Sequence, residues 1–335
     1  DIGANGNNPE IIKNYILSFL ISSIDPPTHI LLVGDAGVAP HKDWSSPYDG
    51  YTFPNEDYFV ELDGNDYFPE MIIGRFTNQE DYRLQVMVNK FINYEKYPER
   101  INNSWYKKGI VCSNDQYQSQ IDTKRYTANI MREDGNFISV DTMMSKPNCL
   151  YSVSDVVAAI NDGRSYLNYR GEGWSDGWWA SCTPVKTSHI NGLNNGKKLT
   201  FVTSIGCGVA MFTTNDANCF GEAWIELGTP TQPRGGVAFV GPTSNTHTTY
   251  NNYLDKGIYI GMFREGLDSP GEALLRGKLH MYSVFGNTIA VEHHFKIYCV
   301  LGDPSIHIWK DTPNPVIVTR PDSIYIGLNQ VQISV

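Results

Sequence analysis

Cys207 is the side chain whose type and setting best suit covalent chemistry. It stands between two glycines, directly after the apolar run 199–206. A thiol at the carboxyl end of a buried strand is held rigidly yet stays reachable, and small neighbours let a substrate carbonyl approach the local backbone N–H groups. This placement indicates acyl transfer by a cysteine nucleophile. The alternative is that Cys207 only fills space, because free cysteine is among the most buried residue types.

A second polar group stands in the segment 168–174, where Glu172 lies between Gly171 and Gly173. Flanking glycines at a strand end let one charged side chain project into a cleft while backbone amides face a ligand. The alternative is a tight turn that carries a solvated carboxylate.

The elements that must position these residues follow a recurring pattern. Short apolar runs bounded by turn residues occur at 28–35, 71–76, 109–115, 165–171, 199–207 and 236–241. Such runs are typical of parallel strands buried on both faces. Capping-box spacing at Thr77–Glu80 and Ser152–Asp155 predicts helices between them. The alternation predicts an α/β fold with a mainly parallel sheet, helices on both faces and ligands beyond the carboxyl ends of the strands.

Composition excludes several classes of protein. The chain has 335 residues, of which 41% are hydrophobic and 19% charged, too rich in core-forming side chains for a disordered protein. A formal charge of −10 without any Lys- or Arg-rich stretch argues against a nucleic acid partner. No window reaches the roughly 20 apolar residues that a membrane span needs. We therefore expect a soluble protein without a membrane span.

The six cysteines at 112, 149, 182, 207, 219 and 299 are scattered, and no pair has C-x-x-C spacing. This argues against a disulfide scaffold and a structural zinc site. If Cys207 stays free, at least one further cysteine is unpaired. The tail differs from the rest: after a Pro-rich linker, residues 316–335 alternate apolar and polar side chains. We expect a main domain over residues 1–311, and a linker with the first strands of an all-β domain over residues 312–335.

The segment 199–227, with Ser204-Ile205-Gly206-Cys207 and Cys219-Phe220-Gly221-Glu222-Ala223-Trp224, resembles the catalytic-cysteine region of the gingipain family of cysteine peptidases, family C25. Similar segments lie in the family's order at 31–35, 62–68, 73–76, 235–239 and 301–305. Together they cover about residues 10–309. The resemblance implies a caspase-like fold with a mainly parallel sheet flanked by helices, followed by the start of an immunoglobulin-like β domain. It also implies a secreted or cell-surface protein with a Cys–His dyad and an orienting carboxylate.

The resemblance assigns the nucleophile to Cys207 and the orienting carboxylate to Asp115, but Glu172 stands where the family has its histidine. An imidazole takes the thiol proton near neutral pH and then stabilises the thiolate as an imidazolium. A carboxylate repels the thiolate instead. Loss of a general base typically removes on the order of 10²–10⁴ of rate. A conventional dyad is therefore absent.

Three replacements for the missing histidine stay open. Glu172 could be kept protonated by burial near Asp115, Arg170 could supply positive charge, or another histidine could enter the cleft. The best such histidine is His247, in a loop after the apolar run 236–241 that resembles a pocket-forming loop of the gingipains; the alternative is a surface histidine without a role. His189, His293 and His294 are weaker candidates, and we expect His293 and His294 to pack or to face solvent.

Further site residues follow from the same reasoning. The backbone N–H groups of Cys207 and Gly173 are candidates for the oxyanion site, beside Gly171. Trp174, Trp178 and Trp179 either line a substrate groove or cap the core. Oxygen ligands at Asp57, Asp63 and Asp66 could hold a structural calcium ion, which the resemblance favours, although a solvated loop is the default. No cofactor is required for the chemistry.

The leading hypothesis is a cysteine endopeptidase domain that acts on peptide or protein substrates through Cys207, with a non-standard or missing base. The alternative is a catalytically inactive C25 homologue that serves as a secreted binding module or a cell-surface module. A third class is calcium-dependent adhesion, or attachment to the cell surface, through the downstream β domain.

Overall fold

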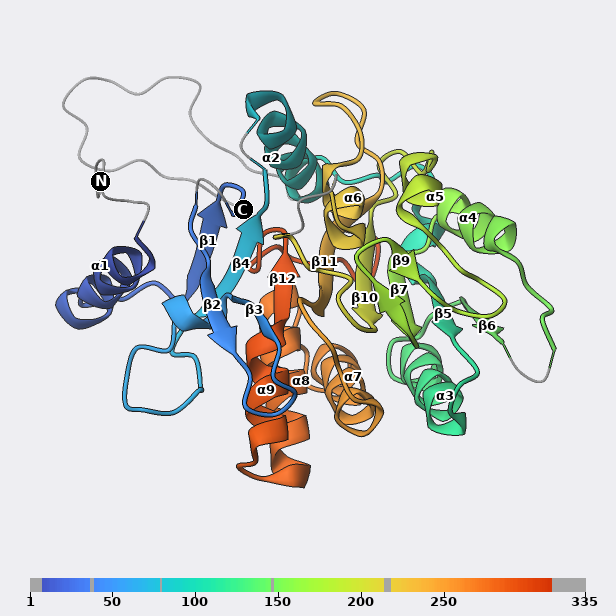
Figure 1. Ribbon diagram of the computed structural model, residues 1–335. Coiled ribbons are helices and arrows are strands. Elements are labelled where there is room, and N and C mark those ends of the chain that lie inside the picture. The colour runs from blue at the N-terminus through green and yellow to red at the C-terminus, as the bar shows by residue number, and fades with distance from the viewer. Residues whose placement is uncertain (1–7, 37–38, 79, 146–147, 214–217, 315–335) are drawn as a thin grey trace, which may run out of the picture.

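The computed structural model describes residues 8–36, 39–78, 80–145, 148–213 and 218–314. Its centre is an eight-stranded sheet (Figure 1). In spatial order the strands are β1 (His29–Val33), β4 (Ile72–Phe76), β12 (Tyr298–Leu301), β11 (Gly236–Pro242), β10 (Thr200–Ile205), β7 (Tyr166–Arg170), β5 (Lys108–Ser113) and β6 (Ser139–Met144). All six apolar runs identified in the sequence form strands, as predicted. Strands β6 and β12 were not predicted.

The sheet consists of two parallel blocks that run in opposite directions. Strands β6, β5, β7, β10 and β11 pair in parallel, and so do β1, β4 and β12. The blocks meet where β12 pairs antiparallel with β11, with Val240 opposite Val300. The sheet is therefore mainly parallel, as predicted. The carboxyl ends of β1 and β4 lie at the opposite edge from those of the larger block, so β6, β5, β7, β10 and β11 bring their carboxyl ends together.

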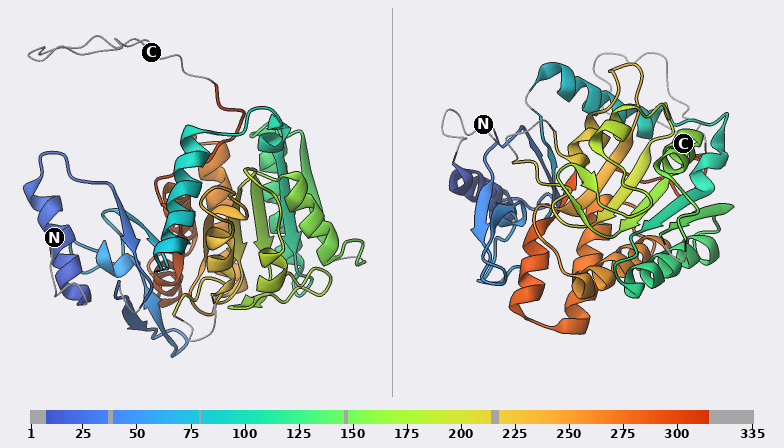
Figure 2. Two further views of the ribbon diagram at one scale, coloured as in Figure 1. Left: turned by 90° about the horizontal axis from the view of Figure 1, so that it is seen from above. Right: turned by 45° about the vertical axis from the view of Figure 1, so that its right-hand side comes forward.

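Helices cover both faces of this sheet. Figure 2 shows one layer with α2 (Asp81–Lys96), α4 (Val153–Asp162), α5 (Thr187–Asn191) and α6 (Phe220–Glu226), and another with α3 (Gln118–Glu133), α7 (Thr248–Phe263) and α8 (Pro270–Phe285). The remaining helices are α1 (Pro9–Ser22), α9 (Ile289–Ile297) and the short helices η2 (Asp57–Phe59) and η3 (Asn103–Lys107). Two small hairpins complete the fold: β2 (Lys42–Ser45) with β3 (Thr52–Asn55), and β8 (Gly173–Trp174) with β9 (Gly177–Trp178).

One of the two predicted helix starts is correct. Helix α4 begins after Ser152, which forms a capping box with Asp155, and it ends at Gly163, whose φ of 104° favours glycine. Helix α2 begins later than predicted. Its N-cap is Glu80 rather than Thr77, and the side chain of Asn78 accepts the N–H of Glu80 in the turn before the helix. An Asx turn therefore replaces the predicted capping box.

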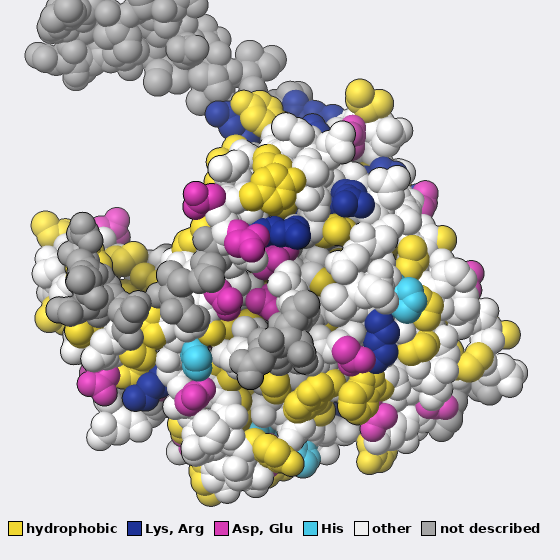
Figure 3. Space-filling view, turned by 45° about the horizontal axis from the view of Figure 1, so that its top comes forward, with side chains coloured by type: hydrophobic (Ala, Val, Ile, Leu, Met, Phe, Trp, Pro, Cys, Tyr) yellow, Lys and Arg dark blue, Asp and Glu magenta, His cyan; other side chains and the backbone are white. Residues whose placement is uncertain are grey.

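Burial in the sheet explains why its edge can hold a site rigidly. Every residue of β7 and of β10 is buried. On the face shown in Figure 3, Lys and Arg side chains are scattered among Asp and Glu side chains, and the residues visible there form no continuous basic surface. No helix in the described ranges is long and apolar enough to cross a membrane. The predicted β segment from Val316 onward lies outside the described residues, so the predicted start of a second domain stays a prediction.

Candidate functional site

The ends of three neighbouring strands place the predicted site residues at one level. Arg170, the last residue of β7, is aligned with Ile205 of β10 and with Ser113 of β5. The candidates Glu172, Cys207 and Asp115 each stand two residues beyond one of these aligned positions. Backbone hydrogen bonds continue the alignment past the strands, from Gly171 N to Ile205 O (3.2 Å) and from Asn114 N to Arg170 O (3.0 Å).

Glycines let the Cys207 turn and the Glu172 turn touch. A Cβ atom on Gly206 would lie 2.8 Å from the carbonyl oxygen of Gly171, so even alanine is excluded at this position. Gly208 has a φ of +58°, and a Cβ there would lie 2.7 Å from the ring of Trp174. These close approaches explain why glycine flanks Cys207 on both sides. The two predicted turns are therefore brought together.

Cys207 lies in a pocket of about 210 Å³, which is also lined by Arg170, Glu172, Thr246 and His247. Its Sγ accepts a hydrogen bond from the backbone N–H of Thr246 at 3.3 Å and lies 3.4 Å from Thr246 Oγ1. Among the six cysteines, Cys149 and Cys182 form a disulfide, while Cys112, Cys219 and Cys299 are free and buried. Burial raises the pKa of each of these three thiols. Cys207 is therefore the one free thiol that a substrate can reach.

A chain of side chains holds Thr246 in place. Asn251, in the first turns of α7, donates from Nδ2 to Thr246 Oγ1 at 2.7 Å, and it accepts from the hydroxyl of Tyr298 in β12 at 2.7 Å. Tyr298 and Asn251 are both buried. No sequence pattern points to these residues, because they come from three separate elements. Together they fix the hydrogen-bond donor that faces the thiol.

Glu172 is held by amide groups rather than by another charge. Asn114 Nδ2 donates to one carboxylate oxygen at 3.3 Å, and Gln116 Nε2 donates to the other at 2.7 Å. Asp115, between these two residues, turns its carboxylate to the hydroxyl of Ser181 at 2.8 Å. Asp115 thus follows its strand at the same distance as Glu172 follows the neighbouring strand, as predicted, but its carboxylate does not contact Glu172. Its two neighbours have the supporting role that the resemblance assigned to it.

His247 lines the pocket and is supported by two buried histidines of α9. Its backbone N–H donates to Nε2 of His294 at 3.0 Å, and Nδ1 of His294 is 2.6 Å from Ala290 O. His294 therefore accepts at Nε2 and donates at Nδ1, which is the neutral imidazole. Burial, with a contribution from the neighbouring His293, holds the pKa of His294 well below its ordinary value. His293 and His294 pack in the interior, in line with expectation.

The ring of His247 meets the edge of Tyr48, with 4.9 Å between the ring centroids. Nε2 of His293 is hydrogen-bonded to Asn245 O at 2.8 Å, and this contact supports the loop that carries His247. His189 lies in α5, where its Nδ1 accepts the backbone N–H of Lys186, and it does not line the pocket. Among the candidate histidines, His247 is the one that lines the same pocket as Cys207.

Arg170 also lines the pocket and is 1% exposed. Its guanidinium donates to Asn252 Oδ1 (3.0 Å), Ile205 O (3.2 Å) and Thr248 O (3.1 Å). All three acceptors are neutral. Arg170 therefore joins the ends of β7 and β10 to the start of α7.

The three tryptophans have different surroundings, and none of them lines the pocket. Trp178 is fully buried, stacks on Tyr169 at a centroid distance of 4.1 Å, and donates to Ser204 Oγ. It belongs to the core, so the groove-wall interpretation fails for this residue. Trp179 is exposed, and Trp174 packs over Gly208 beside the cysteine.

The predicted calcium ligands are not gathered around one point. Asp57 is buried and forms an ion pair with Lys278 at 2.5 Å. Asp63 and Asp66 are exposed, and Asp66 accepts the backbone N–H of Phe68. No group of three His, Cys, Asp or Glu side chains in the part of the chain that the structure describes could hold a metal ion. The arrangement does not fit calcium at this loop.

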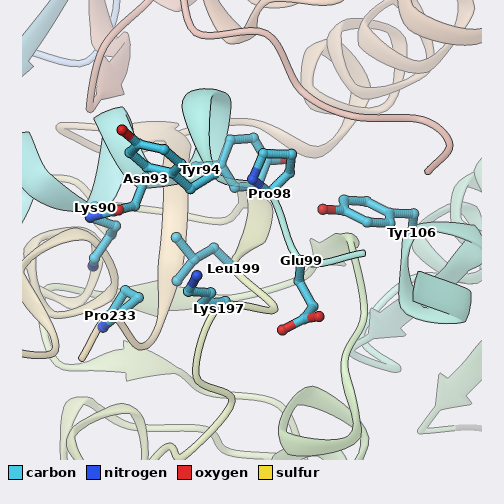
Figure 4. Close-up of a pocket in the computed structure, with 10 residues that line it drawn as sticks. Lys90, Asn93, Tyr94, Pro98, Glu99, Tyr106, Lys197, Leu199 and Pro233 are labelled. Atoms are coloured by element: carbon cyan, nitrogen blue, oxygen red, sulfur yellow. The ribbon is translucent and has the colours of Figure 1, made fainter. Parts of the chain in front are cut away.

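A further pocket lies at the amino end of β10 and is lined by Lys90, Tyr94 and Leu199 (Figure 4). Its volume of about 10 Å³ holds little more than one water molecule. Lys90 donates to Ile225 O at 2.6 Å, and burial lowers its pKa to about 7. Leu199 precedes β10 and Cys207 follows it, so the two pockets lie at opposite edges of the sheet.

Comparison with known proteins agrees with this architecture. Residues 1–309 match the sequence profile described as Peptidase family C25. Gingipain R2 of Porphyromonas gingivalis is 25% identical over 312 residues, and the match covers 89% of this chain and 40% of that protein. Lys-gingipain HG66 of the same species is 23% identical over 293 residues, covering 80% and 16%. The chain thus spans less than half the length of these relatives.

A solved structure with the same fold is the crystal structure of the Arg-specific cysteine proteinase gingipain R. It superposes with a TM-score of 0.82 at 21% sequence identity, covering 95% of this chain and 72% of that one. The predicted caspase-like α/β fold of the gingipain type is confirmed.

Proposed function

This chain belongs to peptidase family C25, and we propose that it hydrolyses peptide bonds with Cys207 as the nucleophile. One observation carries this proposal. Of the four free cysteines, only Cys207 is accessible, and it lies in a pocket where a backbone N–H is directed at its sulfur. The Thr246 N–H is placed to donate to this sulfur when it acts as a nucleophile.

The proposed reaction begins when the Cys207 thiol passes its proton to the His247 imidazole and the sulfur attacks the carbonyl carbon of the substrate peptide. In this scheme backbone N–H groups of Cys207 and Gly173 stabilise the oxyanion, Gly171 lines the pocket, and Trp174 packs over Gly208 beside the nucleophile. The peptide C–N bond then breaks, and the leaving amine takes a proton from the His247 imidazolium. A water molecule then attacks the thioester and passes a proton to His247; the C–S bond breaks, the carboxylic acid product leaves, and the proton returns from His247 to the Cys207 sulfur. Since His247 lines the same pocket as Cys207, it is the substitute base in this scheme.

A second candidate function is an inactive C25 homologue that uses the pocket for binding. The observation that favours it is the position of Glu172, which is aligned with Cys207, carries a carboxylate and is fixed by Asn114 and Gln116. No histidine within the described ranges is hydrogen-bonded to Cys207. A pocket that binds peptides without cleaving them would keep these features.

Hydrolysis of an unfolded protein substrate separates the two candidates. We expect the wild type to release new peptide N-termini, Cys207→Ala to release none, and His247→Ala to lose most of the rate. Cys219→Ala is the matched control, because that thiol is buried. Equal rates for the wild type and Cys207→Ala would contradict the peptidase proposal, and an inert wild type that still binds peptide would favour the second candidate.

We further propose a secreted or cell-surface location. The Cys149–Cys182 disulfide supports it, because disulfides persist in oxidising compartments. Attachment to the surface through a domain downstream of residue 311 is part of the same proposal.

A further inference from the structure

Three polar side chains meet in the interior, between the sheet and the helix layer that contains α3 and α7 (Figure 2). Lys124 comes from α3, Asn168 from the strand β7, and Asp255 from α7. Each of them exposes 0% of its surface, and none of them lines the Cys207 pocket. Burial of an ammonium and a carboxylate is costly, so the arrangement of these groups is informative.

The contacts place the Lys124 amine against the Asn168 amide. Nζ of Lys124 contacts Oδ1 of Asn168, and it lies 2.5 Å from Oδ2 of Asp255. The other carboxylate oxygen of Asp255 accepts from Nδ2 of Asn168 at 3.0 Å. Asp255 therefore bridges the amine and the nitrogen of the amide. A nucleophile, an electrophile and a proton carrier in mutual contact are the groups that transfer of an acyl group from one nitrogen to another needs.

Lys124 can lose its proton in these surroundings. Burial lowers its pKa to about 8, although the neighbouring Asp255 opposes this shift. The neutral amine is the nucleophilic form of lysine, and desolvation in an apolar site is one of the ways in which proteins activate it. The ring centroid of the buried Tyr259 lies 6.0 Å from Nζ.

Two threonines hold the Asn168 amide at both ends. Oδ1 accepts from Thr127 Oγ1 at 3.0 Å, so a hydroxyl faces the oxygen that gains negative charge when the amide carbon is attacked. Nδ2 donates to Thr203 Oγ1 at 2.7 Å. Both threonines are fully buried. Groups held in contact in this way react as if each were present at about 10⁵–10⁸ M, which compensates for the low reactivity of an amide.

We propose that Lys124 and Asn168 form an intramolecular isopeptide bond, with Asp255 as the proton carrier. The Lys124 ammonium passes one proton to Asp255, and the electron pair on Nζ attacks Cγ of Asn168. A second proton moves from Nζ through Asp255 to Nδ2, and the Cγ–Nδ2 bond breaks. The departing ammonia takes up the first proton and leaves as ammonium, which restores the Asp255 carboxylate.

The reaction replaces the Cγ–Nδ2 bond by a Cγ–Nζ bond, so it needs no oxidant, cofactor or external reactant. The new bond joins helix α3 to a central strand of the sheet. It restricts the unfolded chain in the same way as a disulfide does. The inference is independent of the proposed peptidase function, because it involves neither Cys207 nor a substrate.

The mass of the purified full chain tests the inference. After reduction of the disulfide, we expect the wild type to be lighter than its sequence mass by one ammonia. Trypsin does not cleave after an acylated lysine, so the digest should contain segment 109–125 joined to segment 165–170. Lys124→Arg should have its full sequence mass, because a guanidinium is not a nucleophile. Lys96→Arg, at an exposed lysine, is the control and should lose one ammonia as the wild type does.

Asp255→Asn tests the proton carrier, because it keeps the shape of the side chain and cannot take up the proton. Most of this variant should stay unlinked, since loss of a general base removes on the order of 10²–10⁴ of rate. A folded Asp255→Asn that is linked as completely as the wild type would contradict the role of Asp255.

A wild type with its full sequence mass would overturn the inference. Loss of ammonia without the joined segments would also overturn it, because the ammonia would then come from another asparagine. A link from Lys124 to Asp255 would release water instead of ammonia, and it would identify the wrong acceptor in the proposal. The wild type alone gives these three results, so the test is decisive even if a variant does not fold.

Discussion

The backbone N–H of Thr246 donates to Sγ of Cys207 across 3.3 Å, so the segments that follow two adjacent strands of the sheet meet at this sulfur. Thr246 follows β11, and Cys207 follows β10. In a Cys–His dyad, a histidine side chain would interact with the sulfur. Here the interaction comes from a main-chain group whose position depends on the loop around it, and the activity of the thiol should therefore depend on residues that never touch a substrate.

Removal of the Asn251 side chain should weaken this arrangement. Asn251→Ala deletes the donor to Thr246 Oγ1 and leaves the hydroxyl of Tyr298 without its acceptor. We expect Cys207 to alkylate several-fold more slowly at neutral pH, because the Thr246 N–H is held less firmly toward sulfur. Asn194→Ala, an exposed asparagine before β10, is the control. An unchanged alkylation rate in folded Asn251→Ala would show that the loop keeps its position without this support.

Replacement of Glu172 by histidine should increase peptide hydrolysis. Glu172→His removes a carboxylate and places an imidazole at the level of Cys207, where it can act as a base. A gain of about 10²-fold in the rate is expected, at the lower end of what a general base supplies. Glu172→Gln separates the two effects, since it removes only the charge. If both variants hydrolyse peptides no faster than the wild type, Glu172 does not occupy the position of the base.

The buried His294 should make the fold sensitive to acid. Its pKa is lowered in the folded protein, so the unfolded chain takes up a proton at a higher pH than the folded chain does. The stability that neutral His294 provides is present above the ordinary histidine pKa of about 6.5 and is lost as the pH falls below it. Denaturant unfolding at pH 7 and pH 5 should show a smaller decrease in stability for His294→Gln than for the wild type. His307→Gln, an exposed histidine, should behave as the wild type. Equal decreases in all three proteins would contradict the assignment.

Lys90 should give a pH effect at the alkaline side. Burial lowers its pKa to about 7, so the folded protein disfavours the charged form that the unfolded chain carries up to a pH near 10.5. Stability is therefore lost as the pH falls from 10.5 toward 7. Between pH 9 and pH 7 the wild type should lose roughly 2 kcal/mol relative to Lys90→Met. The exposed Lys96 of the same helix provides the control variant Lys96→Met. If the free energy of unfolding of the wild type and of Lys90→Met changes with pH in the same way, Lys90 has the same charge in the folded and the unfolded protein, and the prediction is wrong.

The position of Cys207 could be predicted because a buried strand has a strong local signature and its end is a fixed point in the fold. The details around it depend on geometry that single segments do not encode. Asp115 has the right level, yet the turn directs Asn114 and Gln116 toward Glu172 and Asp115 toward Ser181. The antiparallel pairing of β12 with β11, which brings Tyr298 to Asn251, could not be predicted either, because the residues of an apolar run do not show in which direction the strand runs.

Covalent labelling tests the central claim most directly. The protein is incubated with a thiol-directed peptidyl inhibitor, and the adduct is located by intact mass and peptide mapping, with Cys219→Ala and Cys207→Ala run in parallel. We predict one adduct per chain on Cys207 in the wild type and in Cys219→Ala, and none in Cys207→Ala. A wild type that stays unlabelled from mildly acidic to mildly alkaline pH, or an adduct that persists in Cys207→Ala, would contradict the account.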